Sequence, residues 1–404
     1  MGRKLLVTLA LSLCAEAVSA QVANTSSAST STINTAAPVA YVYVSSKHYI
    51  HAYKAWADGK ITSVTGSPFP YAGVASVSVT KNFLFGADTS QNLFSYSIHS
   101  NGSISKVSSL HTPMYQASGC EQSGFGTQVD YSQATLYYYA CTYGFNTNTY
   151  LSFHINSTGS LQFLGGSGGA ISAATQGTPE ILTKMGGNSF AFDSYCAEDD
   201  FDTPVIQIFR RQSNGNLVFY GEENHMPEPA PGTAYCAGMV AADASNHLAA
   251  AVQRIDSQPH DAGYIYGPYF IASYTSDANG NLSTTSTYQN MPAPVVAQNR
   301  DIRAMSISPD GKYVAVGADG FEVMHFNGAN PVTNFSGAFL AGHDIVKFGW
   351  DNVHHLYVLS AVNSGGTYTT YLHIFNVTST GVKEVSGSPH YIANLTNLTV
   401  LDLQ

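Results

Sequence analysis

The stretch Ser306-Ile-Ser-Pro-Asp-Gly-Lys-Tyr-Val-Ala-Val316 contains the local pattern that decides the fold. Apolar and small polar residues alternate on both sides of Pro309-Asp310-Gly311, and a period of two is typical of a β-strand with one buried face. Pro-Asp-Gly is a turn sequence, because proline presets the backbone angle and glycine accepts a positive φ. The stretch therefore predicts a tight β-hairpin. Weaker copies of this hairpin span residues 77–85, 129–138, 181–192, 239–252 and 346–359.

A second repeat places an aromatic residue six positions before a turn glycine. Asn, Asp or Thr precedes each of these glycines, and Asn-Gly or Asp-Gly between alternating apolar runs is the strongest short hairpin signal. Two hairpins per unit predict a four-stranded blade of a β-propeller. The pairs are Tyr53 with Gly59, Tyr96 with Gly102, Phe153 with Gly159, Phe209 with Gly215, Tyr274 with Gly280, and Phe375 with Gly381.

The number of repeats predicts an all-β fold with seven blades. Between the hairpins of Phe209 and Phe375 there is room for two units, and Phe321-Glu-Val-Met-His-Phe326 supplies the third strand of the sixth blade in degenerate form. The chain ends in a strand, Leu395 to Leu403, that begins no blade of its own, whereas Ala40 to Val44 opens a blade that lacks an inner strand. We therefore expect the C-terminal strand to complete the N-terminal blade and close the ring, which removes open sheet edges.

The N-terminus has the pattern of an export signal. Arg3 and Lys4 precede the apolar run Leu5 to Leu13, and small residues before Gln21 suit cleavage, so residues 1–20 are predicted to be a signal peptide. A membrane anchor is the alternative, but it needs about 20 apolar residues and Glu16 interrupts the run. Residues 21–39 are rich in Ser, Thr and Ala and predict a flexible leader. The propeller then spans residues 40–404, and we expect a secreted or periplasmic monomer with no membrane span.

Composition excludes some classes of partner. The net charge is −10, and nucleic acid or an anionic membrane demands a basic face. The sequence contains no P-loop, dinucleotide fingerprint or Gly-x-Ser-x-Gly elbow. Histidines show no metal-ligand spacing, and the acidic loop Glu198 to Asp202 lacks the pattern of a dedicated Ca²⁺ loop. We therefore predict no nucleic-acid partner, no cofactor and no metal.

The cysteines suggest disulfides. Cys14 would leave with the signal peptide, and an even number of cysteines in an exported chain is compatible with two bonds. The hairpin phase places Cys120, Cys141, Cys196 and Cys236 near one rim, which favours Cys120 with Cys141 and Cys196 with Cys236. Buried free thiols are the alternative.

The whole region after the leader resembles the propeller lactonases, which include bacterial 6-phosphogluconolactonases and carboxymuconate cyclases. The resemblance rests on the opening Ala40-Tyr-Val-Tyr-Val-Ser-Ser-Lys-His-Tyr-Ile-His-Ala-Tyr53, on Gly-Ser-Pro at residues 66–68 and 387–389, and on the Pro-Asp-Gly hairpin. It implies a seven-bladed propeller and hydrolysis of a lactone. Family chemistry is associated with Arg and His at the starts of inner strands. Here Arg303-Ala-Met-Ser-Ile-Ser-Pro309 has the arginine, but Ala304 stands where the family tends to have histidine.

Candidate site residues gather at the rim where inner strands start and second strands end. Arginine can grip a carboxylate or phosphate at two points, and histidine can act as a general base. The candidate catalytic residues are Arg303, Arg254, His343 and His260, and the candidate ligand-binding residues are Arg300, Asp301, Asp344 and Asp256. Salt bridges between blades are the alternative interpretation of these charges.

Two functions follow from the sequence. The first is a non-catalytic exported propeller that binds a small molecule, a glycan or a protein at the channel rim, because the full Arg and His set of the family is missing. The second is a lactone hydrolase or cyclase in which Arg303 and Arg254 hold an anionic substrate and His343 or His260 acts as base. Tyr137 to Tyr139 and the aromatic run 264–270 are expected to wedge between blades, although such rings can also stack on a sugar.

Overall fold

The structure is a computed structural model of the 404-residue chain. It describes residues 37–71, 73–112, 126–130, 132–142, 147–167, 171–172, 183–184, 190–195, 205–223, 225–256, 265–298 and 300–404. These residues belong to one compact unit, which begins at Thr35. The signal peptide and most of the leader lie outside the described residues, so these assignments stay predictions.

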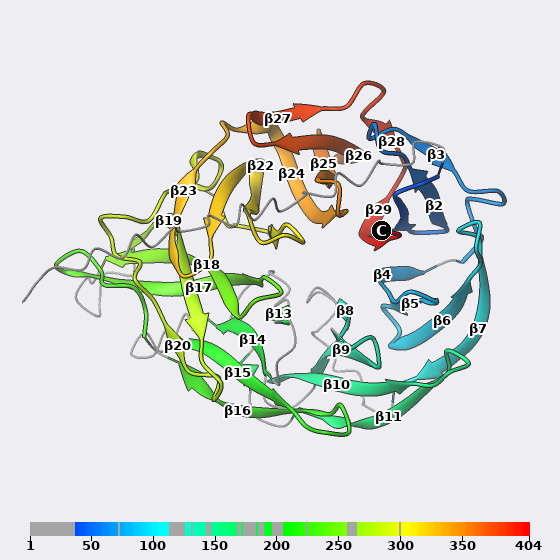
Figure 1. The fold of residues 1–404 in the computed structure, drawn as a ribbon, viewed down its shortest axis with the longest axis horizontal. Coiled ribbons are helices and arrows are strands. Elements are labelled where there is room, and N and C mark those ends of the chain that lie inside the picture. The colour runs from blue at the N-terminus through cyan, green and yellow to red at the C-terminus, as the bar shows by residue number, and fades with distance from the viewer. Residues whose placement is uncertain are drawn as a thin grey trace, which may run out of the picture. The chain divides into compact units, whose positions relative to one another are not determined.

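The chain forms antiparallel sheets that follow one another as the blades of a β-propeller (Figure 1). The first sheet combines both ends of the chain and contains β29 (Leu395–Asp402), β1 (Ala40–Ser46), β2 (Ile50–Ala55) and β3 (Ile61–Ser63). The second contains β4 (Val74–Val79), β5 (Phe83–Asp88), β6 (Asn92–Ile98) and β7 (Ile104–His111). The third contains β8 (Gly126–Val129), β9 (Thr135–Thr142), β10 (Thr147–Ile155) and β11 (Leu161–Gly166), with β12 (Ile171–Ser172) beside β10.

The remaining sheets complete the described fold. The fourth contains β13 (Thr183–Lys184), β14 (Phe190–Tyr195), β15 (Val205–Arg211) and β16 (Leu217–Glu223), and the fifth contains β17 (Thr233–Ala242), β18 (His247–Asp256), β19 (Ile265–Ser276) and β20 (Leu282–Ser283). The last sheet has eight strands, which are β21 (Ala304–Ile307), β22 (Tyr313–Asn327), β23 (Asn330–Asn334), β24 (Phe339–Trp350), β25 (His355–Ser364), β26 (Thr367–Thr378), β27 (Gly381–Glu384) and β28 (His390–Tyr391).

Helix is almost absent from the described residues. One short 3-10 helix, η1 (Val295–Ala297), precedes the eight-stranded sheet. Among the described residues, no helix is both long enough and apolar enough to cross a membrane.

All six hairpins predicted from an aromatic residue and a glycine are present. They are the antiparallel pairs β2 with β3, β6 with β7, β10 with β11, β15 with β16, β19 with β20, and β26 with β27. The aromatic residue of most pairs is completely or almost completely buried, as for Phe153, Phe209 and Tyr274. The local prediction therefore holds because the turn glycine and the buried ring fix the same register.

The two chain ends meet in one sheet. β29 pairs antiparallel with β1, from Ala40 opposite Asp402 to Ser46 opposite Leu395. Leu395 and Leu398 of the C-terminal strand pack in the same apolar cluster as Val42 and Val44. The C-terminal strand thus supplies the inner strand of the N-terminal blade, as its sequence predicts.

The core lies between successive sheets. One cluster joins Phe85 of β5 to Leu136 and Tyr138 of β9, with Phe153 of β10 against them. Large rings fill such interfaces because each removes much apolar surface from water. Tyr137 and Tyr139 are also buried, and the hydroxyl of Tyr137 donates to the carbonyl of Gly215 in the next sheet at 3.1 Å. The run 137–139 therefore packs between blades, as expected.

Candidate functional site

Arg303 lies immediately before β21, at the rim where inner strands begin. Its backbone N–H donates to the carbonyl of Gly317 in β22 at 2.8 Å, which fixes the start of the strand. Its Nη1 lies 2.9 Å from Oδ1 of Asp344 on β24, and the two side chains are 46% and 36% exposed. An ion pair this exposed contributes about 0–1 kcal/mol to the stability of the fold. A stabilising role therefore does little to explain why the two charges are placed together. The guanidinium keeps further donors that face solvent.

His343 lies next to Asp344 on β24, with its ring held by a buried hydroxyl. Its Nδ1 is 3.1 Å from Oγ of Ser360 on β25, and Ser360 is fully buried. Burial lowers the pKa of His343, and the nearby carboxylates of Glu384 and Asp319 oppose that shift. His343 is therefore neutral at pH 7, the state in which imidazole can accept a proton.

A second histidine, His373 on β26, lies against the ring of His343. The rings of His343 and His373 lie 5.5 Å apart, and Nδ1 of His373 is 2.8 Å from Oε1 of Glu384. Ser388 donates to the same carboxylate oxygen at 2.8 Å. Burial also lowers the pKa of His373, although its contact with Glu384 opposes the shift. The other ring nitrogen of His373, Nε2, is buried without a hydrogen-bond partner among the described residues.

The ion pair and the histidines lie on opposite faces of β24. His343 and Asp344 are consecutive strand residues, and consecutive side chains point to opposite faces of a sheet. Ser360 pairs with Ile345, which shares a face with His343, whereas Asp344 pairs with Ala361. The structure thus brings Arg303 to Asp344 and His343 to Ser360, but it does not join the two pairs into one constellation.

The other predicted site residues are more dispersed. Arg254 lies near the end of β18, opposite Tyr235. Burial raises the pKa of the Tyr235 hydroxyl, and the charge of Arg254 opposes that shift. Arg300 and Asp301 are exposed in the segment before β21, and the hydroxyl of Tyr269 donates to Asp301 at 3.4 Å. Asp256 ends β18, and its side chain lies outside the described part of the structure. His260 also lies outside the described residues.

The two predicted disulfides stay untested, because three of the four cysteine side chains lie outside the described part of the structure. Cys236 is buried in β17 at 2% exposure. Cys120 and Cys196 lie outside the described residues, as does the side chain of Cys141 in β9. Both predicted pairings therefore stay predictions. Within the described ranges, no group of three or more His, Cys, Asp or Glu side chains is arranged to hold a metal ion.

Sequence reasoning missed the groups that surround His343. Ser360, His373 and Glu384 come from three different strands, so no spacing along the chain connects them. Strand alternation was the available signal, because it places Ser360 and His373 on one face once the register of β25 with β26 is known. That register does not follow from the sequence pattern.

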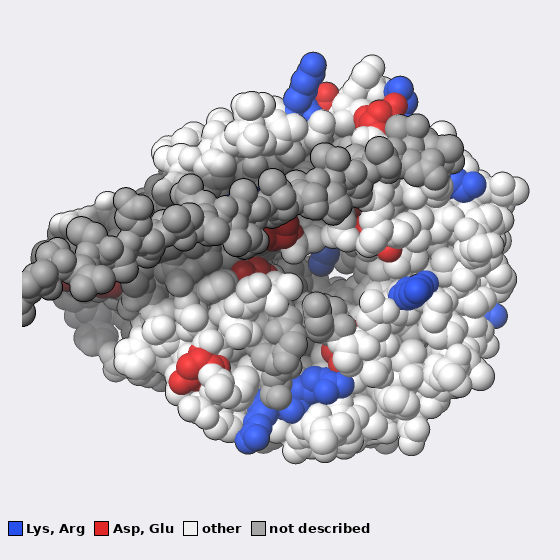
Figure 2. Space-filling model, in the orientation of Figure 1, with Lys and Arg blue, Asp and Glu red and all other residues white. Residues whose placement is uncertain are grey.

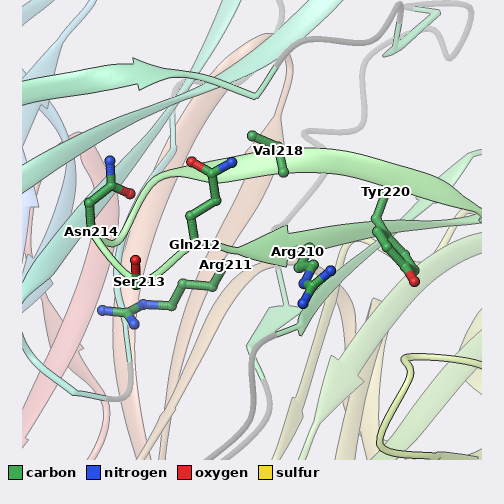
Figure 3. Close-up of a pocket in the computed structure, with 7 residues that line it drawn as sticks. All are labelled: Arg210, Arg211, Gln212, Ser213, Asn214, Val218 and Tyr220. Carbon is green, nitrogen blue, oxygen red and sulfur yellow. The ribbon is translucent and has the colours of Figure 1, made fainter.

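A hollow of about 750 Å³ lies on another part of the propeller, at the hairpin of β15 and β16 (Figure 3). It was also missed from the sequence. Its polar lining comes from two arginines and the turn that follows them, and its apolar lining from β16. The lining residues are Arg210, Arg211, Gln212, Ser213, Asn214, Val218 and Tyr220.

Comparison with known proteins identifies the fold and no family. No family model matches the chain, and no curated protein matches it in sequence. A protein of Lactobacillus plantarum with a crystal structure is 14% identical, with a TM-score of 0.55 over 90% of this chain and 100% of that chain. Kuenenia stuttgartiensis hydrazine synthase is 10% identical, with a TM-score of 0.44 over 87% of this chain and 92% of that chain. Hsv2 of Kluyveromyces marxianus is 11% identical, with a TM-score of 0.47 over 87% of this chain and 94% of that chain. At 14% identity, the similarity to the Lactobacillus plantarum protein shows the fold alone.

Proposed function

We propose that the chain is a seven-bladed, closed β-propeller that binds a small anionic molecule at the rim beside Arg303. The blade count depends on the eight-stranded sheet, which we interpret as two blades. The N–H of Phe326 donates to the carbonyl of Lys312 at 2.8 Å, so the two ends of β22 pair with each other as a hairpin. An equivalent hydrogen bond joins the second and third strands of other blades, from the N–H of Ile98 to the carbonyl of Asn82 and from the N–H of Val377 to the carbonyl of His354. β21, the two halves of β22 and β23 then make one blade, and β24 to β27 make the next.

Contacts between neighbouring sheets support ring closure. A turn glycine in one sheet lies against the first residues of the second strand in the preceding sheet, as Gly159 does against Phe83 and Gly280 against Phe190. Gly59 of the N-terminal sheet occupies the same kind of position against His355 at the start of β25. The N-terminal blade therefore follows the last blade in the same way that the inner blades follow one another.

The half-exposed ion pair of Arg303 and Asp344 carries the functional proposal. It stands at the start of an inner strand, which is the end of a propeller channel where ligands usually bind. Asp344 occupies one edge of the guanidinium, and the remaining donors can bind one carboxylate or phosphate of a ligand. Asp344 also fixes the guanidinium in position, so less conformational entropy is lost on binding.

Binding fits the geometry better than catalysis does. A hydrolase needs its base within hydrogen-bond reach of the water that attacks the carbonyl of the held substrate. His343 and Asp344 leave β24 on opposite faces, so the base and the anion-holding ion pair do not face the same space. Ala304 takes the position where propeller lactonases tend to have histidine, so the rim offers Arg303 without that partner. The apparent signal peptide supports an exported, secreted or periplasmic protein, and the acidic charge argues against nucleic acid as the ligand.

Lactone hydrolysis is the second candidate, and His343 is the observation that favours it. Its lowered pKa and its bond to the buried Ser360 make it a neutral, oriented base. A water activated by its Nε2 could attack a lactone carbonyl whose acidic group is held by Arg303.

Calorimetric titration of the purified chain with gluconate and with phosphate tests the binding proposal. We expect one saturable site that weakens by about tenfold or more in Arg303→Ala, because a hydrogen-bonded charge is lost. Unchanged affinity in Arg303→Ala, with the same unfolding midpoint as the wild-type chain, would refute the assignment.

A further inference from the structure

The hollow at the β15–β16 hairpin contains one arginine that forms an ion pair and one that does not. Arg211 lies 2.8 Å from Oδ2 of Asp130 and donates to Oγ of Ser132 at 3.3 Å, so it fastens the hairpin to the neighbouring sheet. Arg210 is exposed, and its guanidinium makes no hydrogen bond or ion pair within the described part of the chain. Figure 3 shows the two side chains directed apart. Arg210 is therefore a cation available to a ligand.

Arg210 stands beside an aromatic surface. Its guanidinium carbon lies 5.7 Å from the centre of the Tyr220 ring, and Tyr220 is 49% exposed. Phe190 of β14 meets that ring edge-on at 5.5 Å between ring centres, which supports the ring from one side. A half-exposed aromatic ring held in this way offers a flat apolar face with a polar hydroxyl at its edge.

The turn of the hairpin adds hydrogen-bonding groups to the same hollow. Gln212, Ser213 and Asn214 are all exposed and line it. Oδ1 of Asn214 accepts the N–H of Asn216 at 2.9 Å, which fixes the amide and leaves its NH₂ as a donor. Figure 2 shows basic side chains over β15 and β16, whose only basic residues are Arg210 and Arg211.

We propose that this hollow is a binding site for an acidic sugar, such as a hexuronate unit of a polysaccharide. The guanidinium of Arg210 would take the carboxylate at two points, and the ring of Tyr220 would lie against the sugar ring. The amides and hydroxyl of residues 212–214 would bind the sugar hydroxyls. The site lies in a different sheet from Arg303 and does not depend on the function proposed for the rim.

Calorimetric titration of the full chain with a galacturonic acid trimer tests this proposal. A galactose trimer isolates the contribution of the carboxylate, and sodium sulfate isolates the contribution of simple anion binding. We expect saturable binding of the galacturonate trimer that is at least about tenfold tighter than binding of either control, because the carboxylate and the ring act together. Equal binding of the galactose trimer, equal binding of sulfate, or no saturable binding of the acidic trimer would overturn the proposal.

Variants locate the binding. We expect Arg210→Gln to weaken binding of the galacturonate trimer by about tenfold or more. Arg210→Lys should weaken this binding less, because the charge remains. Tyr220→Leu should also weaken it, because the aromatic face is lost. Lys106→Gln is the matched control, since Lys106 lies over the Phe94 ring at 5.0 Å in another sheet. Unchanged binding in Arg210→Gln, or an equal loss in Lys106→Gln, would place the sugar elsewhere and refute the assignment.

Discussion

Replacement of Gly159 by alanine tests the contact that orders the blades. Gly159 turns the β10–β11 hairpin at φ +84°, and an added Cβ would lie 2.5 Å from Cδ1 and Cε1 of Phe83 in the preceding sheet. A residue with a Cβ at such a φ costs about 1–2 kcal/mol. Overpacking against a neighbouring side chain costs about 1–3 kcal/mol more. We therefore expect Gly159→Ala to lower the free energy of unfolding by about 2–5 kcal/mol.

Equilibrium urea unfolding followed by fluorescence measures this loss, and two glycines separate its causes. Gly366 has φ +87° with no atom near its Cβ position, so Gly366→Ala should cost only the backbone term of about 1–2 kcal/mol. Gly337 has open space and no positive φ, so Gly337→Ala should change stability by less than about 0.5 kcal/mol. If Gly159→Ala cost no more than Gly366→Ala, the close approach between neighbouring sheets would be refuted.

The remaining predictions concern the seam between the chain ends, the buried histidine and the cysteines. Deletion of residues 395–404 should abolish cooperative unfolding, because several buried leucines are lost at a cost of about 2–5 kcal/mol each. Deletion of residues 21–35 should leave the unfolding midpoint unchanged. Burial lowers the pKa of His373 below the value of 6.5 in an unfolded chain. As the pH falls through 6.5, the unfolded state therefore binds more protons than the folded state, and the free energy of unfolding decreases. His373→Gln should flatten that part of a plot of unfolding midpoint against pH, and an unchanged slope would contradict the assignment. Mass mapping without reduction should find Cys196 linked to Cys236, and any other linkage would contradict the expected strand phases.

Local turn chemistry made the repeating part of the fold predictable. Each outer hairpin joins a buried aromatic residue to a glycine at a fixed distance, so register and turn come from one short segment. The seam between β1 and β29 was also predictable, because an inner strand without a blade of its own near the C-terminus matches a blade that lacks an inner strand at Ala40 to Val44.

The candidate site was less predictable because its contacts join distant strands. The sequence placed Arg303 and Asp344 at one rim, but their ion pair depends on the packing of β21 beside β24. The environment of His343 depends on the register of three strands, and Ser360 has no motif of its own. Arg210 and Tyr220 lie on neighbouring strands, and a hollow between them follows from side-chain packing rather than from spacing.

Hydrolysis of lactones by the purified chain tests the central claim most directly, because it separates a binding propeller from an enzyme. 6-Phosphogluconolactone, which has an acidic group that Arg303 could hold, and dihydrocoumarin represent sugar and aromatic lactones, and the spontaneous rate in the same buffer is the reference. We predict that the wild-type chain hydrolyses neither above that rate. Turnover that is lost in Arg303→Ala, with the unfolding midpoint unchanged, would contradict the proposed function and establish the rim as a catalytic site.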